Sequence, residues 1–367
     1  MNKKINSIIS LVLATVLSLL MAAPASATNN FVESNVDSPH INTEKMLPYI
    51  YEVAKDAENW GYGVENFDSL YIGLPIHTYE YLKTGTLREN AFVYYPVFSD
   101  DELLFLILEN EDGSIQLTQG FCDLLPFFSD EYIAIIYDLN KTYIACADAE
   151  KTRIAYEFNI PTEKRGNFYN ISQALPNAQV KWTFFSRYER IPSLEYVAQP
   201  AYDPDHPPIN LSVPKVLQYY DYICWAASTA SIGNYLTGKN YTAVNVAQQK
   251  YGYTEKEFNQ GASLSESTEM LLKLYNISYP NVETNNPPDN GRIYTNLESG
   301  YPMYGRWQCS SGSTHQTVIR GISLTSKRLY IMDPLQGYIS VQYSNGGYNY
   351  VGESGYSFTC IGYASKL

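Results

Sequence analysis

The stretch Gln218-Tyr219-Tyr220-Asp221-Tyr222-Ile223-Cys224-Trp225-Ala226-Ala227-Ser228 decides the fold class of this chain. A glutamine stands six residues before a cysteine, and the cysteine opens an Ala- and Ser-rich run that continues to Leu236-Thr237-Gly238. This pattern predicts a helix that begins near Cys224 and ends with Gly238 close to its C-terminal cap.

A thiol at a helix N-terminus faces unpaired backbone N–H groups and the positive end of the helix dipole, and both stabilise a thiolate. Cys224 is therefore a candidate nucleophile. Gln218 is close enough in sequence to fold back, so that its amide donates to an oxyanion that develops near the sulfur. The structural alternatives are an inert buried cysteine and a glutamine that caps a loop.

Two residues further along the chain complete a candidate triad. His315 is the only histidine after residue 206, and it begins a predicted strand over 316–322 that follows another at 301–305. A short apolar strand over 329–332 ends in Asp333-Pro334. Neighbouring antiparallel strands would place His315 beside Asp333, so that the carboxylate fixes the imidazole tautomer while the other ring nitrogen faces Cys224. Turn residues without a catalytic role are the alternative for both.

These residues resemble the papain-like cysteine peptidases. The likeness is greatest to a bacterial branch that includes bacteriocin-processing (double-glycine leader) peptidase-like proteins and effector-type papain-like proteases of plant pathogens. It covers residues 213–367, and Val213-Pro214 is similar to the start of such domains. Two positions differ from plant and animal papains, because Asp221 and Asp333 stand where those enzymes have a second cysteine and an asparagine.

The resemblance implies a role for each residue of the set. Cys224 attacks a carbonyl carbon, His315 acts as general base and then as general acid, and Asp333 orients His315. Gln218 completes an oxyanion hole with the backbone N–H of Cys224. The resemblance thus implies an α+β catalytic domain in which the helix that carries the cysteine packs on an antiparallel sheet.

Composition limits the other classes of function. The 367 residues are 45% hydrophobic and 17% charged, which excludes a disordered or collagen-like chain and predicts about two domains. A net charge of −13 gives no electrostatic basis for binding nucleic acid. Four histidines and five cysteines form neither a Cys-x-x-Cys pair nor a His-Glu-x-x-His motif, so we expect no metal and no cofactor.

The first 27 residues are typical of a secretory signal peptide. Lys3 and Lys4 precede an apolar stretch over 8–23, and Ala25-Ser26-Ala27 follows as a cleavage site. An uncleaved membrane anchor is the alternative. We expect a protein that is secreted to the cell surface or the medium, without stable insertion in a membrane.

Charge and proline content divide the remaining chain. Residues 28–200 hold 26 acidic and 12 basic side chains, whereas residues 201–367 hold 12 and 11. Between them lie five prolines within fifteen residues, Pro200, Pro204, Pro207, Pro208 and Pro214. We therefore predict an acidic domain over 28–198, a proline-rich linker over 199–212 and the catalytic domain over 213–367.

The acidic domain has the pattern of a helix followed by an antiparallel sheet. Apolar residues at helical spacing predict a helix over 44–60. Strands are predicted at 91–98, 103–108, 114–118, 132–137, 142–147 and 153–158, with hairpin turns at 110–113 and 138–141. His40 and His77 are isolated, so this half shows no cluster of chemistry-bearing residues.

The cysteines other than Cys224 suggest two bridges, Cys122–Cys146 and Cys309–Cys360, with reduced buried cysteines as the alternative. The run Gly346-Gly347-Tyr348-Asn349-Tyr350 is typical of a hairpin turn and carries no functional expectation. The acidic domain occupies the place of a pro-region, so it is a candidate intramolecular inhibitor removed by cleavage over 187–208. A permanent accessory domain that contacts the cell surface or the substrate is the alternative.

The sequence thus predicts a secreted cysteine endopeptidase, made as a zymogen, that acts on a protein or peptide substrate. A cell-wall peptide amidase and a transglutaminase-like acyl transferase use related chemistry. A catalytically silent surface-binding protein is the alternative from another class.

Overall fold

The computed structural model describes residues 43–129, 131–138, 141–147, 152–159, 171, 174–175, 178–191, 203–344 and 347–367. The expected signal peptide, His40 and residues 199–202 of the expected linker lie outside the described residues. Within the described ranges, no helix combines the length and the apolar character that a membrane crossing needs.

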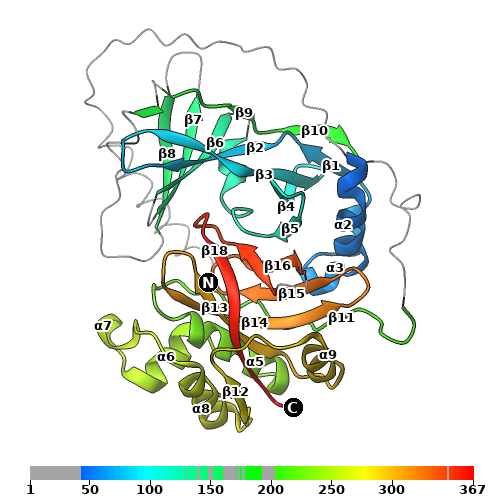
Figure 1. Cartoon of the computed structure of the whole chain (residues 1–367), viewed down its shortest axis with the longest axis vertical. Coiled ribbons are helices and arrows are strands. Elements are labelled where there is room, and N and C mark those ends of the chain that lie inside the picture. The colour runs from blue at the N-terminus through cyan, green and yellow to red at the C-terminus, as the bar shows by residue number, and fades with distance from the viewer. Residues whose placement is uncertain are drawn as a thin grey trace, which may run out of the picture.

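The N-terminal half begins with helices and continues as a sheet (Figure 1). Its helical segments are α2 (Thr43–Lys55), α3 (Ala57–Trp60), η1 (Val64–Phe67) and η2 (Leu125–Phe128). Its strands are β1 (Leu70–Gly73), β2 (Ile76–Tyr81), β3 (Leu87–Ser99), β4 (Glu102–Asn110), β5 (Ile115–Thr118), β6 (Tyr132–Asp138), β7 (Lys141–Ala147), β8 (Thr152–Asn159), β9 (Thr183–Phe184) and β10 (Arg187–Arg190). All six strands expected in this half are present, whereas β1, β2, β9 and β10 were not expected.

The C-terminal half alternates a helical run with a strand run. The helices are α5 (Cys224–Thr237), α6 (Ala243–Tyr251), α7 (Glu255–Phe258), α8 (Leu264–Tyr275) and α9 (Asn290–Glu298). The strands are β11 (Ile209–Asn210), β12 (Asn281–Glu283), β13 (Met303–Cys309), β14 (Thr314–Ser323), β15 (Arg328–Asp333), β16 (Gly337–Gln342), β17 (Asn349–Val351) and β18 (Ser357–Ser365). Segregated helices and antiparallel strands confirm the α+β class.

One hydrogen-bonded sheet connects the two halves. In the C-terminal half the antiparallel order is β12, β18, β13, β14, β15 and β16. Strand β16 then pairs with β5 of the N-terminal half, with Ile339 opposite Thr118 and Val341 opposite Gln116. From β5 the sheet continues through β4 and β3 to β2, which pairs in parallel with β6.

The described part of the proline-rich segment, residues 203–212, contains a short strand. Ile209 and Asn210 form β11 and pair with Ile322 and Gly321 of β14. A Cβ atom at Gly321 would lie 2.5 Å from the backbone oxygen of Ile209, so glycine permits this close approach. The end of the segment is thus held against the catalytic sheet.

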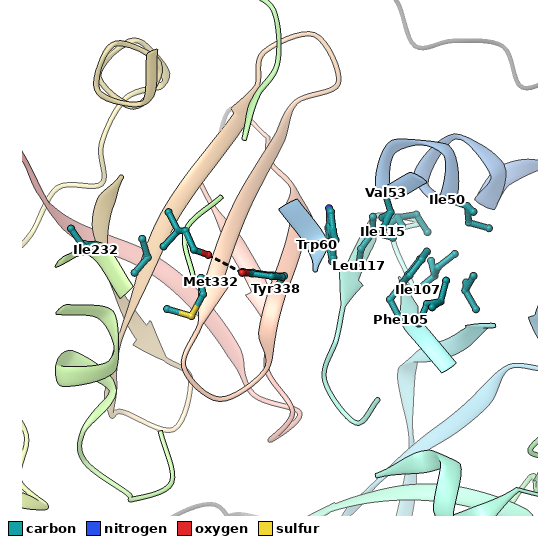
Figure 2. Close-up of a cluster of buried hydrophobic side chains, with 14 of the residues drawn as sticks. Ile50, Val53, Trp60, Phe105, Ile107, Ile115, Leu117, Ile232, Met332 and Tyr338 are labelled. Carbon is teal, nitrogen blue, oxygen red and sulfur yellow. Dashed lines mark hydrogen bonds between the residues drawn. The ribbon is translucent and has the colours of Figure 1, made fainter. Parts of the chain in front are cut away.

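A shared hydrophobic core fills the junction of the two halves (Figure 2). Trp60, at the end of α3, lies 6.3 Å from the ring of Phe105 in β4 and 6.5 Å from the ring of Tyr338 in β16. The same cluster includes Ile232 of α5 and Met332 of β15. Apolar side chains from both halves are therefore buried against one another, which stabilises the association of the two halves.

Buried polar contacts cross the same junction. The fully buried Arg328 side chain donates to the backbone oxygen of Ile115 at 3.2 Å and lies 3.3 Å from the Glu52 carboxylate of α2. Arg320, also fully buried, donates to the backbone oxygen of Asn59 at 2.8 Å and stacks on the Tyr338 ring. Loss of the N-terminal half would leave both guanidinium groups short of partners.

All five cysteines are free in the structure, so neither expected bridge forms. Cys309 of β13 lies opposite Phe358, whereas Cys360 of β18 lies opposite Trp307, two residues out of register. Cys146 is buried in β7, and Cys122 follows β5 in a separate turn. The structure agrees with the alternative expectation, in which these cysteines are reduced.

We predict that Trp60→Ala lowers the free energy of unfolding by about 3–5 kcal/mol, because it opens a cavity between Phe105 and Tyr338. Urea denaturation followed by circular dichroism measures the change. Phe127→Ala is the matched control, since that side chain is 79% exposed and its loss should change stability by at most about 0.5 kcal/mol. Equal midpoints for the two variants would show that Trp60 does not hold the junction.

Candidate active site

Helix α5 places Cys224 at its first residue, as expected, and ends at Gly238 in the left-handed conformation (φ 70°). The N–H groups of a first helical turn have no acceptor within the helix, so they surround the half-buried thiol with positive potential. One turn on, the Ser228 hydroxyl donates to the backbone oxygen of Gln316 at 3.1 Å. This bond fixes the start of α5 against the strand that carries His315.

His315 and Asp333 meet because β14 and β15 are antiparallel neighbours, with Val318 opposite Met332. Nε2 of His315 lies 3.0 Å from Oδ1 of Asp333. The Cys224 side chain lies close enough to the His315 ring to raise its pKa. Because Asp333 occupies Nε2, Nδ1 is the ring nitrogen left for the sulfur. The predicted nucleophile, base and orienting residue therefore lie together at one site.

The Asp333 carboxylate is 1% exposed and accepts three further hydrogen bonds. The backbone N–H of Leu335 donates to Oδ1 at 2.7 Å. The Gln336 amide and the Tyr350 hydroxyl donate to Oδ2 at 3.3 and 2.8 Å. Such a set of donors stabilises the ionised form of a buried carboxyl group.

Charge coupling sets the protonation of this pair. Burial alone would raise the pKa of Asp333, but His315 and the surrounding donors outweigh burial and lower it. Burial likewise disfavours the charged form of His315, yet the Asp333 carboxylate and the Cys224 sulfur raise the pKa of its ring above the ordinary value. At neutral pH the site therefore holds a carboxylate beside an imidazolium ring.

Aromatic rings fix the orientation of these groups. The Tyr350 ring stacks on Phe358 with centroids 4.9 Å apart and packs edge-on against Trp307. Phe358 in turn lies 5.6 Å from the His315 ring. The rings exclude water from one side of the imidazole, so the His315–Asp333 contact keeps its electrostatic strength.

Gln218 lies in the loop before α5, and its backbone N–H donates to the Pro334 oxygen at 2.9 Å. This bond brings the loop to the residue that follows Asp333. The side-chain amide donates to the backbone oxygens of Tyr220 and Asp221 at 3.0 and 3.3 Å, and its Oε1 atom is buried without a partner. The amide donors thus face the loop in this structure.

Three residues at the site were missed by the sequence analysis. Tyr350 belongs to the run 346–350, for which only a hairpin turn was expected, and it binds Asp333. Gln336 binds Asp333 and accepts a hydrogen bond from Thr118 of β5 at 3.3 Å. The spacing Asp333-x-x-Gln336 at the end of β15 was the one local sequence signal that could have indicated this contact. Thr118 shows that the N-terminal half contacts the surroundings of the triad.

Among the described residues, no group of three or more His, Cys, Asp and Glu side chains is placed to hold a metal ion. The chemistry that the arrangement supports is that of a nucleophilic sulfur with a proton-carrying imidazole.

The class defined by this fold and site is supported by comparison with known families. Residues 208–348 match the model of the family described as papain-like cysteine protease AvrRpt2. The match confirms the resemblance to papain-like cysteine peptidases, of the effector type, and supports a cysteine peptidase. The matched range includes Gln218, Cys224, His315 and Asp333. No curated protein matches the chain.

We predict that Tyr350→Phe lowers kcat/KM about tenfold, because the variant removes one donor from a buried carboxylate without changing the packing of the ring. Steady-state hydrolysis of a peptide substrate measures the effect. Tyr348→Phe is the matched control, since its hydroxyl donates to Asn290 and not to the triad. A rate for Tyr350→Phe equal to that of Tyr348→Phe would contradict this positioning role.

The raised pKa of His315 predicts how activity depends on pH. His315 stays protonated until the pH rises above the pKa that it has in the folded protein. This pKa therefore sets the alkaline limb of the pH profile of kcat/KM. Asp333→Asn removes the charge that raises the pKa of His315. We therefore expect the alkaline limb to move to lower pH and kcat/KM to fall partially. Asp203→Asn, in the exposed His206–Asp203 pair, should leave the profile unchanged. An unmoved limb in Asp333→Asn would refute the coupling.

The same pair makes stability depend on pH in two directions. The contribution of His315 is complete below its unfolded pKa and is lost as pH rises through its folded, raised pKa. The contribution of Asp333 is complete above its unfolded pKa and is lost as pH falls through its folded, lowered pKa. The pair therefore stabilises the fold most around neutral pH.

Proposed function

We propose that the protein is a secreted cysteine endopeptidase that hydrolyses peptide bonds through Cys224, His315 and Asp333. The hydrogen bond between His315 and the buried Asp333 carboxylate, with the Cys224 side chain beside the same ring, is the observation that carries the proposal. The family match supports a protein or peptide as the substrate.

The proposed reaction uses the groups in order. The Cys224 sulfur, as a thiolate, bonds to the carbonyl carbon of the peptide, and the His315 imidazolium gives its proton to the departing amine as the C–N bond breaks. Neutral His315 then takes a proton from water, whose oxygen attacks the thioester and releases the acid and the thiolate. Asp333 stays ionised throughout and holds the ring by Nε2.

The oxyanion that forms on the carbonyl oxygen needs donors near the sulfur. The backbone N–H of Cys224 is one candidate, because the first helical residue has no acceptor within the helix. The Gln218 amide is the second, and for this role it must turn from the Tyr220 and Asp221 oxygens toward the substrate. Its unpartnered Oε1 atom is consistent with a side chain that gains a better position when substrate binds.

Maturation is proposed to involve removal of residues 1–27 on export and a cut within 187–208. The β5–β16 pairing and the Arg328–Glu52 contact favour fragments that remain associated after such a cut. The N-terminal half is then an accessory part of the enzyme, whereas an inhibitory pro-domain would have to dissociate. N-terminal sequencing combined with size-exclusion chromatography of protein from the culture medium distinguishes the two: co-eluting fragments support retention, and a lone C-terminal fragment contradicts it.

Covalent labelling tests the proposed nucleophile. We predict that a trans-epoxysuccinyl thiol inhibitor modifies Cys224 alone and stops hydrolysis of casein, because no described histidine lies beside any of the other thiols. Mass spectrometry of the protein under reducing conditions locates the adduct. Cys224→Ala and His315→Ala should both abolish turnover while Cys146→Ala, a buried thiol in β7, retains it.

Two outcomes would overturn parts of this proposal. Full turnover in Cys224→Ala would remove the nucleophile. Hydrolysis of purified cell wall without hydrolysis of casein would replace the endopeptidase by a cell-wall peptide amidase.

A further inference from the structure

A cavity of about 510 Å³ lies between the two halves of the molecule. The N-terminal half contributes Glu102 and Asp123 to its lining, and the C-terminal half contributes Lys215, Gln218, Gln336 and Glu353. An arginine or lysine side chain fits within this volume with room for water.

The cavity begins beside the triad. Its lining residue Gln336 donates to the Asp333 carboxylate at 3.3 Å, and Leu335 donates to the same group through its backbone N–H at 2.7 Å. On the other side, the backbone of Gln218 is bonded to Pro334. The lining therefore includes residues on both sides of Asp333-Pro334, so the cavity lies next to the candidate triad.

Two buried oxygen atoms of the lining residues have no hydrogen-bond partner among the residues that the structure describes. Glu353 is 7% exposed, and its Oε1 atom accepts from the backbone N–H of Phe121 at 3.0 Å while Oε2 is unpartnered. The Oε1 atom of Gln218 is unpartnered as well. Buried polar atoms without partners are costly, so both favour a ligand that supplies hydrogen-bond partners. Burial raises the pKa of Glu353 to about 8, so its carboxyl group is mostly protonated at neutral pH. A cation bound beside it would lower this pKa, and the ionised Oε2 atom would then accept a hydrogen bond from the cation.

Acidic side chains surround the entrance. Glu102 and Asp123 are exposed and form no ion pair within the described part of the chain. Asp101 is also exposed and lies 2.8 Å from Arg187. Lys215 is the cation of the lining, with its Nζ atom 3.4 Å from Gln119. Negative charge therefore prevails, and the potential at the entrance attracts a positive group.

We propose that this cavity is a substrate subsite that receives a lysine or arginine side chain of the peptide, at a fixed position relative to the cleaved bond. The inference rests on the proposed function and adds its substrate class. Lysine brings three N–H donors and arginine five, which the unpartnered acceptors require, and each brings the charge that Glu102 and Asp123 attract. The N-terminal half thereby takes part in specificity.

Mapping of cleavage sites tests the subsite. We expect casein digested by the mature enzyme to show lysine or arginine enriched at one position around the cuts. In matched peptides, glutamine in place of that lysine should lower kcat/KM on the order of tenfold, because it removes a charge from an acidic cavity. No enrichment, or equal kcat/KM for the two peptides, would overturn the proposal.

Variants assign the preference to the cavity. Glu102→Gln combined with Asp123→Asn should reduce the lysine-to-glutamine ratio of kcat/KM toward one. Glu353→Gln should do the same, since its Oε1 atom can still accept from Phe121 while an amide donor replaces Oε2. Glu111→Gln, an exposed acid of the same half outside this cavity, is the control that keeps the ratio. An unchanged ratio in the first two variants would contradict the assignment.

Binding to the Cys224→Ala protein separates this proposal from the proposed function. Fluorescence anisotropy of labelled peptides should give a lower Kd, on the order of tenfold, for the lysine peptide than for the glutamine peptide. Equal Kd values would refute the subsite even if hydrolysis is observed. Preference for the lysine peptide without any turnover by the wild-type protein would instead retain the subsite and refute the peptidase mechanism.

Discussion

The buried Asp333 carboxylate is the group on which the rest of the site depends. It is nearly inaccessible to water, yet it remains ionised because His315, Tyr350, Gln336 and the Leu335 backbone all donate to it. Its charge raises the pKa of His315, and its position at Nε2 leaves Nδ1 for Cys224. A neutral group at residue 333 would relax both the orientation and the protonation of the imidazole.

The junction of the two halves is the second constraint. Strand β5 extends the catalytic sheet at β16, and the Thr118 hydroxyl reaches Gln336, which itself contacts Asp333. Phe121, a few residues on, satisfies one oxygen of Glu353. The N-terminal half therefore shapes the polar surroundings of the triad. The C-terminal half without the N-terminal half would lack these contacts.

Local pattern predicted the central residues well. Small side chains between Cys224 and Gly238 specify a helix with a clear start and end, and the short apolar strands place His315 and Asp333 on neighbouring strands. The family match at residues 208–348 agrees with the resemblance that these residues carry. Among the strands that were not expected, β1 has only four residues, and β2 mixes His77, Thr78 and Glu80 with apolar positions.

Contacts between distant segments could not be predicted in the same way. Tyr350 reaches Asp333 only because β17 pairs with β18 and stacks Tyr350 on Phe358. Glu353 meets Phe121 across 232 positions of sequence. The sequence near either residue does not indicate its partner. The prediction of disulfides was wrong for the same reason, because strand register decides whether two cysteines lie close enough to bond.

Direct observation of the His315 ring tests the central claim, that a buried carboxylate keeps this imidazole charged beside the Cys224 sulfur. Nitrogen-15 NMR titration of the histidine rings, with His315 assigned by comparison with His315→Ala, reports the protonation of both ring nitrogens. We predict that His315 carries both protons at pH 8 in the wild-type protein. A neutral His315 ring at pH 8, titrating with the ordinary pKa of an exposed histidine, would contradict it.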